Sequence, residues 1–188
     1  TMELPTSSGE RDPSQIRRWT FNLNSRKDTF EEEVVSKTSG FLPRMDDRFL
    51  SLDYQYAFLS SHDPSITPDV KRAPAMARMG RFASNVLQRL DVKTGKINQC
   101  AVEPVVSLQE AMFIPRKGSK AEGDGYVVAI ASNYESTSSD LLIVDATRME
   151  QGVVATVKLP FRLRSGTHGN WYAQSVLPPV KDEFGAST

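Results

Sequence analysis

Short runs of apolar or alternating residues, separated by clusters of glycine, proline, aspartate, asparagine and serine, recur along the whole 188-residue sequence. Runs of this length with a period of two predict β-strands joined by turns, whereas helical periodicity is scarce. The expected strands cover residues 16–23, 29–36, 54–60, 82–91, 96–102, 109–114, 126–133, 140–145 and 153–159. The sequence therefore predicts an all-β chain arranged as a sandwich, a barrel or a propeller.

The connections between these runs also suit an all-β fold. Lys93-Thr94-Gly95 and Gly123-Asp124-Gly125 separate pairs of expected strands, and glycine favours hairpin turns because it accepts a positive φ without steric cost. Residues 60–80 contain three prolines and little periodicity, which predicts a long surface loop with room for one helical turn. Residues 1–15 are polar and are expected to form a loop or tail.

Charge and composition exclude several classes of function. Lys and Arg number 23, as do Asp and Glu, so the formal net charge is zero and there is no general attraction to nucleic acid or to an anionic membrane. The longest apolar runs fall far short of the roughly 20 residues that a transmembrane helix needs. Cys100 is the single cysteine, so no internal disulfide is possible, and the chain is expected to be cytoplasmic. Sequence motifs for nucleotide binding, serine hydrolysis and zinc proteolysis are absent.

His168 is the candidate with the most distinctive setting. It is one of two histidines, it lies in "SGTHGNW" after an expected strand, and glycines near it allow close approach of the backbone. A neutral imidazole held in this way suits iron, zinc or copper, although a histidine in a turn is also commonly just a hydrogen-bonded surface residue. We expect His62, the other histidine, to be solvent-exposed and without a role. Cys100 is expected to be a buried, small apolar side chain.

Two glutamates are candidates to support such a histidine. Glu110 lies in the mostly apolar run "LQEAMFIPR", where an ionised carboxylate needs a partner. A metal-bound histidine commonly donates its second ring N–H to a carboxylate, which fixes the orientation of the ring. Glu103 is a rival candidate seven residues earlier, and a strand glutamate that faces solvent remains an equally simple interpretation of Glu110.

Taken in order, the motifs resemble a known family. The segments are "RRWTFNL", "FLPRMDDRF", "YQYAFLS", "LDVKTGK", "LQEAMFIPR", "EGDGYVVAI", "SDLLIVDA" and "LPFRLRSGTHGNW". Together they resemble the C-terminal portion of the carotenoid cleavage oxygenases, with the stilbene-cleaving and lignostilbene dioxygenases as the nearest likeness. The resemblance implies that residues 1–188 are a C-terminal segment of a single dioxygenase domain, forming the last blades of a seven-bladed β-propeller.

The resemblance also implies the chemistry of a site. Members of the family hold a non-haem Fe(II) with four histidines, three of which contact glutamates. His168 matches the last of these ligands, and Glu110 matches a supporting glutamate because the family spacing Glu-x-x-Phe-x-Pro-Arg fits residues 110–116. Phe41 stands where many relatives have another such glutamate, so no supporting residue is assigned there. The other three ligands and most substrate contacts are expected outside this segment.

The function implied by the resemblance is cleavage of an alkene C=C bond by O2 to give two aldehydes. We expect stilbenes, either resveratrol-like or derived from lignin, to be the substrates, with carotenoids or apocarotenoids as the alternative. A second alternative is a non-catalytic β-propeller interaction module. The segment alone is expected to be inactive, because its ligands would be completed by the rest of the same propeller upstream.

Overall fold

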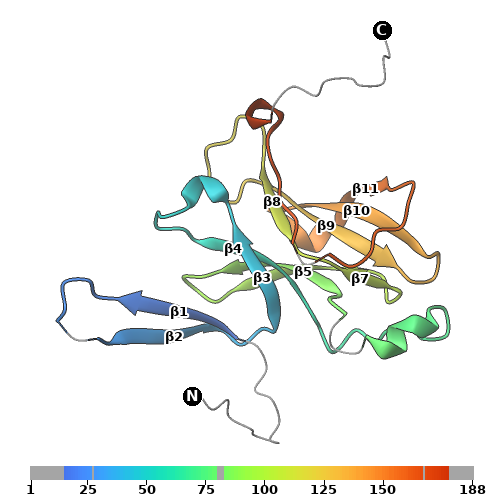
Figure 1. The fold of residues 1–188 in the computed structure, drawn as a ribbon, viewed down its shortest axis with the longest axis horizontal. Helices are drawn as coiled ribbons and strands as arrows, with labels where there is room; N and C mark the ends of the chain where they lie inside the picture. The colour runs from blue at the N-terminus through green and yellow to red at the C-terminus, as the bar shows by residue number, and fades with distance from the viewer. Residues whose placement is uncertain (1–14, 27, 80–82, 167, 178–188) are drawn as a thin grey trace, which may run out of the picture.

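The computed structural model describes residues 15–26, 28–79, 83–166 and 168–177. Within these ranges the regular structure consists of β-strands and short 3-10 helices, without an α-helix, and no helix could cross a membrane. The all-β prediction is therefore confirmed. The expected N-terminal tail lies almost entirely outside the described residues. Figure 1 shows two larger sheets side by side and a separate hairpin projecting from them.

The first large sheet is an antiparallel meander. Its order is β3 (Gly40–Met45), β4 (Tyr56–Ser61), β5 (Val86–Asp91) and β6 (Ile97–Ala101), drawn from cyan to green in Figure 1. The β5–β6 turn forms as the sequence predicts: the Asp91 carboxylate accepts the N–H groups of Lys93 and Thr94, and Gly95 has φ +73°. This sheet positions β3, which borders the candidate site.

The second large sheet is also antiparallel, but one of its edges is interrupted. Strand β9 (Gly125–Asn133) pairs with β10 (Ser138–Asp145), which pairs with β11 (Val153–Lys158). The opposite edge of β9 pairs first with β8 (Met112–Pro115) and then, farther along, with β7 (Val106–Leu108). Residues 109–111 therefore form a break between two short strands, and this break holds Glu110.

The third sheet is the hairpin of β1 (Ile16–Phe21) and β2 (Phe30–Ser36). Trp19, Phe21 and Phe30 cluster on it, with the centroids of Phe21 and Phe30 5.4 Å apart, yet all three are more than half exposed. An isolated two-stranded sheet is at best marginally stable in water. The hairpin therefore has an apolar face that the described part of the chain leaves exposed.

The main core lies between the two large sheets. Phe58 of β4 stacks on Phe113 of β8, with ring centroids 4.7 Å apart and planes at 11°. Both sheets contribute further buried residues to this cluster, including Leu87, Cys100, Val127, Ala129, Leu142 and Val144. The larger of these side chains, the leucines, valines and phenylalanines, each contribute about 1.5–3 kcal/mol when fully buried. The burial of Cys100 confirms its prediction, and this core fixes the two sheets against each other.

Some expectations need correction. The expected helical turn in residues 60–80 is confirmed by the 3-10 helix η2 (Pro74–Arg78). The stretch is not only a surface loop, however, because Ser61 still belongs to β4 (Tyr56–Ser61), and Ala73 and Met76 are buried in the main core. His62 is partly buried rather than solvent-exposed, and its Nδ1 lies 2.9 Å from the carbonyl oxygen of Ala83. A polar ring can be buried there because the carbonyl group supplies a hydrogen-bond partner.

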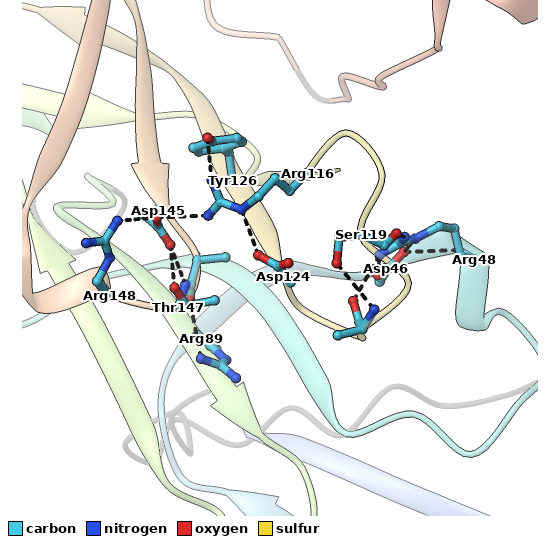
Figure 2. A network of polar contacts seen from close by, with 12 residues as sticks. Asp46, Arg48, Arg89, Arg116, Ser119, Asp124, Tyr126, Asp145, Thr147 and Arg148 are labelled. Atoms are coloured by element: carbon cyan, nitrogen blue, oxygen red, sulfur yellow. Dashed lines mark hydrogen bonds and ion pairs between the residues drawn. The ribbon is translucent and has the colours of Figure 1, made fainter.

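A polar network fixes the end of β8 that lies away from the break (Figure 2). Arg116 donates to Asp124, the residue before β9, to the hydroxyl of Tyr126, and to Asp145 at the end of β10. The hydrogen bonds to Asp124 and Asp145 raise the pKa of the Arg116 guanidinium. Strands β8, β9 and β10 are thereby held in one register.

Asp145 is the most buried of the side chains that Arg116 contacts. Its Oδ1 accepts from the N–H and the hydroxyl of Thr147, and its Oδ2 accepts from Arg116 and Arg148. Burial alone raises the pKa of Asp145, but these hydrogen bonds outweigh burial and hold the pKa well below its ordinary value.

Two further 3-10 helices are short. Helix η1 (Asp47–Phe49) follows β3 and is capped by Asp46, while η4 (Met149–Gln151) precedes β11. A last one, η5 (Gln174–Val176), follows the segment that carries His168.

Candidate metal-ligand site

The segment after β11 runs back across the ends of the second large sheet. The N–H of Leu159 donates to the carbonyl of Ser139 at 3.1 Å, and the N–H of Leu163 donates to the hydroxyl of Ser139 at 3.0 Å. Farther along, the N–H of Gly166 donates to the side-chain oxygen of Gln109 at 3.1 Å. The segment thus passes from the start of β10 to the break between β7 and β8. This path brings His168 next to Glu110.

Glu110 is buried at this break, with a side chain only 5% exposed. Its Oε2 accepts the N–H of Gly169 at 2.8 Å and lies 3.6 Å from Nδ1 of His168. The second distance is longer than a hydrogen bond, so the ring and the carboxylate are neighbours without a formed bond in this chain. The backbone contact to Gly169 holds the histidine segment against the carboxylate.

The glycine that follows His168 lies close to the side chain of Met112. A Cβ atom on Gly169 would lie 3.1 Å from the Met112 sulfur, which is tighter than an ordinary contact. The segment can therefore lie directly on the first residue of β8 while the Gly169 N–H reaches Glu110. A larger residue at position 169 would require the Met112 side chain to shift by a few tenths of an ångström.

Arg44 of β3 completes the cluster and was not among the residues singled out from the sequence. Its Nη1 lies 3.6 Å from Oε1 of Glu110, and its Nη2 donates to Oδ1 of Asn170 at 2.9 Å. Asn170 follows His168 by two residues, so Arg44 lies near both the Glu110 carboxylate and the chain that follows the ring. Arg44 and Asn170 lie 126 positions apart, and no local pattern signals such a contact.

The other residues considered in the sequence lie elsewhere. Glu103 has a side chain that is 70% exposed and faces Arg72 at 3.8 Å, not His168. His62 bonds to Ala83, and Cys100 is buried in the main core. Phe41 lies in β3, where its backbone pairs with Ser60. The structure thus places Glu110, and neither Glu103 nor His62, beside His168.

The chemistry of these groups fits one ligand of a divalent metal, and one only. The imidazole has one nitrogen facing a buried carboxylate, which is the usual arrangement behind a histidine that binds a metal through its other nitrogen. Within the described residues no group of three or more histidine, cysteine, aspartate or glutamate side chains could hold a metal. The His168 side chain is 68% exposed in this chain. A complete metal site would need ligands from outside the described chain.

Comparison with known proteins places the chain in a family. The family model described as Retinal pigment epithelial membrane protein matches residues 2–173. Lignostilbene-alpha,beta-dioxygenase isozyme III of Sphingomonas paucimobilis is 36% identical over 165 residues, covering 87% of this chain and 33% of that protein. Carotenoid cleavage oxygenase 1 of Neurospora crassa is 39% identical over 135 residues, covering 71% of this chain and 25% of that protein. The chain therefore spans about a third or less of the length of these relatives.

Solved structures of carotenoid cleavage oxygenases have a fold similar to that of this chain. The crystal structure of Pseudomonas brassicacearum lignostilbene dioxygenase matches with a TM-score of 0.75 at 34% identity, covering 83% of this chain and 32% of that one. A cobalt-substituted Synechocystis ACO shares the fold with a TM-score of 0.67 at 21% identity, covering 85% of this chain and 32% of that one. The two large sheets are accordingly blades of a β-propeller, and the chain belongs to the carotenoid cleavage oxygenase family.

Proposed function

We propose that the full-length protein is an Fe(II)-dependent dioxygenase that cleaves the C=C bond of a stilbenoid. The observation that carries the proposal is the placement of His168 beside the buried Glu110 in a chain of this family. The 36% identity to a lignostilbene dioxygenase supports the substrate class.

His168 would hold the iron through Nε2, because its Nδ1 faces Glu110. Glu110 would accept the Nδ1 proton, orient the ring and offset the positive charge of the metal. The Gly169 N–H, bonded to the same carboxylate oxygen, fixes the backbone beside the ligand. Bound Fe(II) would supply the means of activating O2, and the remaining ligands would come from the rest of the protein.

The overall reaction balances without an external reductant. One alkene and one O2 give two aldehydes, so the C=C and O–O bonds break and each carbon gains one oxygen atom. The part of this chain in that reaction is to present one neutral imidazole in a fixed orientation. Neutral imidazole ligands would not compensate the positive charge of Fe(II). A carboxylate behind the ring would partly offset that charge without binding the metal itself.

The rest of the propeller is the partner that this segment needs. The exposed aromatic face of the β1–β2 hairpin and the exposed ring of His168 both fit burial against chain outside residues 1–188. We accordingly treat residues 1–188 as a C-terminal segment of one propeller domain. By itself this segment would neither hold iron tightly nor turn over substrate. The single buried thiol, Cys100, fits a reducing compartment such as the cytoplasm.

A carotenoid or apocarotenoid substrate is the alternative, favoured by the 39% identity to a carotenoid cleavage oxygenase. Product analysis of the iron-loaded, full-length protein with resveratrol and with a β-apocarotenal, side by side, decides between the two. The proposal expects aldehyde pairs from the stilbene. Cleavage of the apocarotenal alone would favour the carotenoid-cleaving alternative. Failure of the iron-loaded protein to cleave either compound would refute an alkene-cleaving activity.

A further inference from the structure

Arg44 lies where it can control how Glu110 meets His168. The two oxygens of Glu110 have different neighbours: Oε2 takes the Gly169 N–H and faces the His168 ring, whereas Oε1 faces Arg44. A carboxylate with one free oxygen could rotate about its terminal torsion, which has a broad energy profile. The guanidinium, 3.6 Å from Oε1, attracts this oxygen and so favours the orientation that keeps Oε2 toward the ring.

The same guanidinium also restrains the chain beyond the histidine. Arg44 Nη2 donates to Oδ1 of Asn170, and that oxygen also accepts the N–H of Trp171. Arg44 therefore links the carboxylate behind the ring to the backbone that follows the ring. Lysine has no planar fork and could not make both contacts with one geometry.

The local backbone of β3 gives this arginine its direction. The β3–β4 register shifts between Phe41 and Arg44, and Leu42 within the shift has φ +46°. Such irregularities bend a strand and redirect the next side chains. After the shift Arg44 pairs with Phe58 of β4, whose ring is stacked in the main core, so the arginine stands on a rigid base. Its side chain is 27% exposed, so solvent only partly screens it.

We propose that Arg44 is a positioning residue for the metal ligand His168, acting through Glu110. This inference rests on the proposed iron site. Removal of a residue that orients a metal ligand commonly lowers metal affinity by about 10- to 100-fold. Arg44 contacts the carboxylate and not the ring, so we expect a loss near the lower end, about tenfold.

The test is anaerobic equilibrium binding of Fe(II) alone to the full-length protein, with melting temperatures measured in parallel. The variants are Arg44→Gln, Arg44→Lys, Glu110→Gln and the double variant. Arg72→Gln is the matched control, because Arg72 also bridges distant loops, through Glu135, but lies away from His168.

Four results support the inference together. Arg44→Gln raises the Fe(II) dissociation constant about tenfold, whereas Arg72→Gln leaves it unchanged. Arg44→Lys recovers part of the loss because it keeps the charge. The double variant binds Fe(II) no more weakly than Glu110→Gln, because residues that act through one another are non-additive.

Other results overturn it. A dissociation constant for Arg44→Gln within twofold of wild type, while Glu110→Gln weakens binding, refutes the role of Arg44 and leaves the proposed function standing. Losses in the double variant that multiply show that Arg44 does not act through Glu110. Equal losses of affinity in Arg44→Gln and Arg72→Gln show a merely structural effect. A wild-type protein that binds no Fe(II) refutes the proposed function, and the inference falls with it.

Discussion

Asp145→Asn tests the network that fixes β8, β9 and β10, and the structure indicates how much it should cost. The variant keeps one oxygen, which can still accept from Thr147 where Oδ1 does now. Its amide NH2 then replaces Oδ2 and faces the guanidinium groups of Arg116 and Arg148. Arginine only donates hydrogen bonds, so the amide NH2 of the variant would face two guanidinium groups with no acceptor between them. The site is buried, with the Asp145 side chain only 4% exposed.

The magnitude follows from these contacts. A hydrogen bond to a charged group contributes about 1.5–3 kcal/mol, and loss of one partner from a buried pair costs more. The two arginines can turn toward water, because their side chains are 35% and 59% exposed. We therefore expect the free energy of unfolding to fall by about 2–3 kcal/mol, equivalent to one strong charged hydrogen bond.

The pH dependence provides a second check. The pKa of Asp145 is lower in the folded protein than in the unfolded chain. Its contribution is therefore fully present above the unfolded pKa, about 3.9, and is lost as the pH falls toward the folded value. The stability difference between wild type and Asp145→Asn should be constant from about pH 7 to 5 and smaller near pH 3.

The assay is urea unfolding of the full-length protein at these pH values. Asp53→Asn is the control, because Asp53 pairs with Lys93 at 2.8 Å but has a side chain that is 85% exposed. Surface pairs of this kind contribute little, so its midpoint should stay near wild type. Equal effects of Asp145→Asn and Asp53→Asn, or a difference that persists undiminished at pH 3, would refute this account of the network.

Two other predictions concern the site and the core. Glu110→Gln should weaken Fe(II) binding by about 10- to 100-fold in the full-length protein, because the carboxylate behind His168 is lost. Anaerobic titration with Fe(II) measures this loss. Glu103→Gln is the control, and equal losses of affinity in the two variants would contradict the role of Glu110. Phe113→Ala should lower the free energy of unfolding by about 3–5 kcal/mol in urea denaturation, because it removes the ring that stacks on Phe58 and leaves a cavity. Phe161→Ala, at an exposed ring, should change it by less than about 0.5 kcal/mol, and similar values for both would argue against a core between the sheets.

The long, regularly patterned strands could be predicted from the sequence, and the irregular ones could not. Strands β9 and β10 follow the expected runs closely because their apolar residues are buried against the other sheet. Strand β3 was missed because Pro43 and the positive φ of Leu42 interrupt its pattern. Strand β7 has only three residues, which is too short for any periodicity.

The candidate site was accessible from the sequence only in part. The glycine-flanked His168 and the spacing around Glu110 singled out two residues that the fold places 3.6 Å apart. Arg44 and Asn170 could not be found in this way, because their contact depends on how β3 and the segment after β11 meet. The burial of Ala73 and Met76 in an otherwise polar, proline-containing stretch is likewise set by tertiary packing.

The most direct test of the iron site is the metal content of His168→Ala in the full-length protein, purified anaerobically with Fe(II). His62→Ala is the matched control, since His62 is the only other histidine of this chain and bonds to the Ala83 carbonyl. We predict that His168→Ala loses both bound iron and alkene cleavage, while His62→Ala retains iron. An iron content of His168→Ala close to that of wild type would contradict the account.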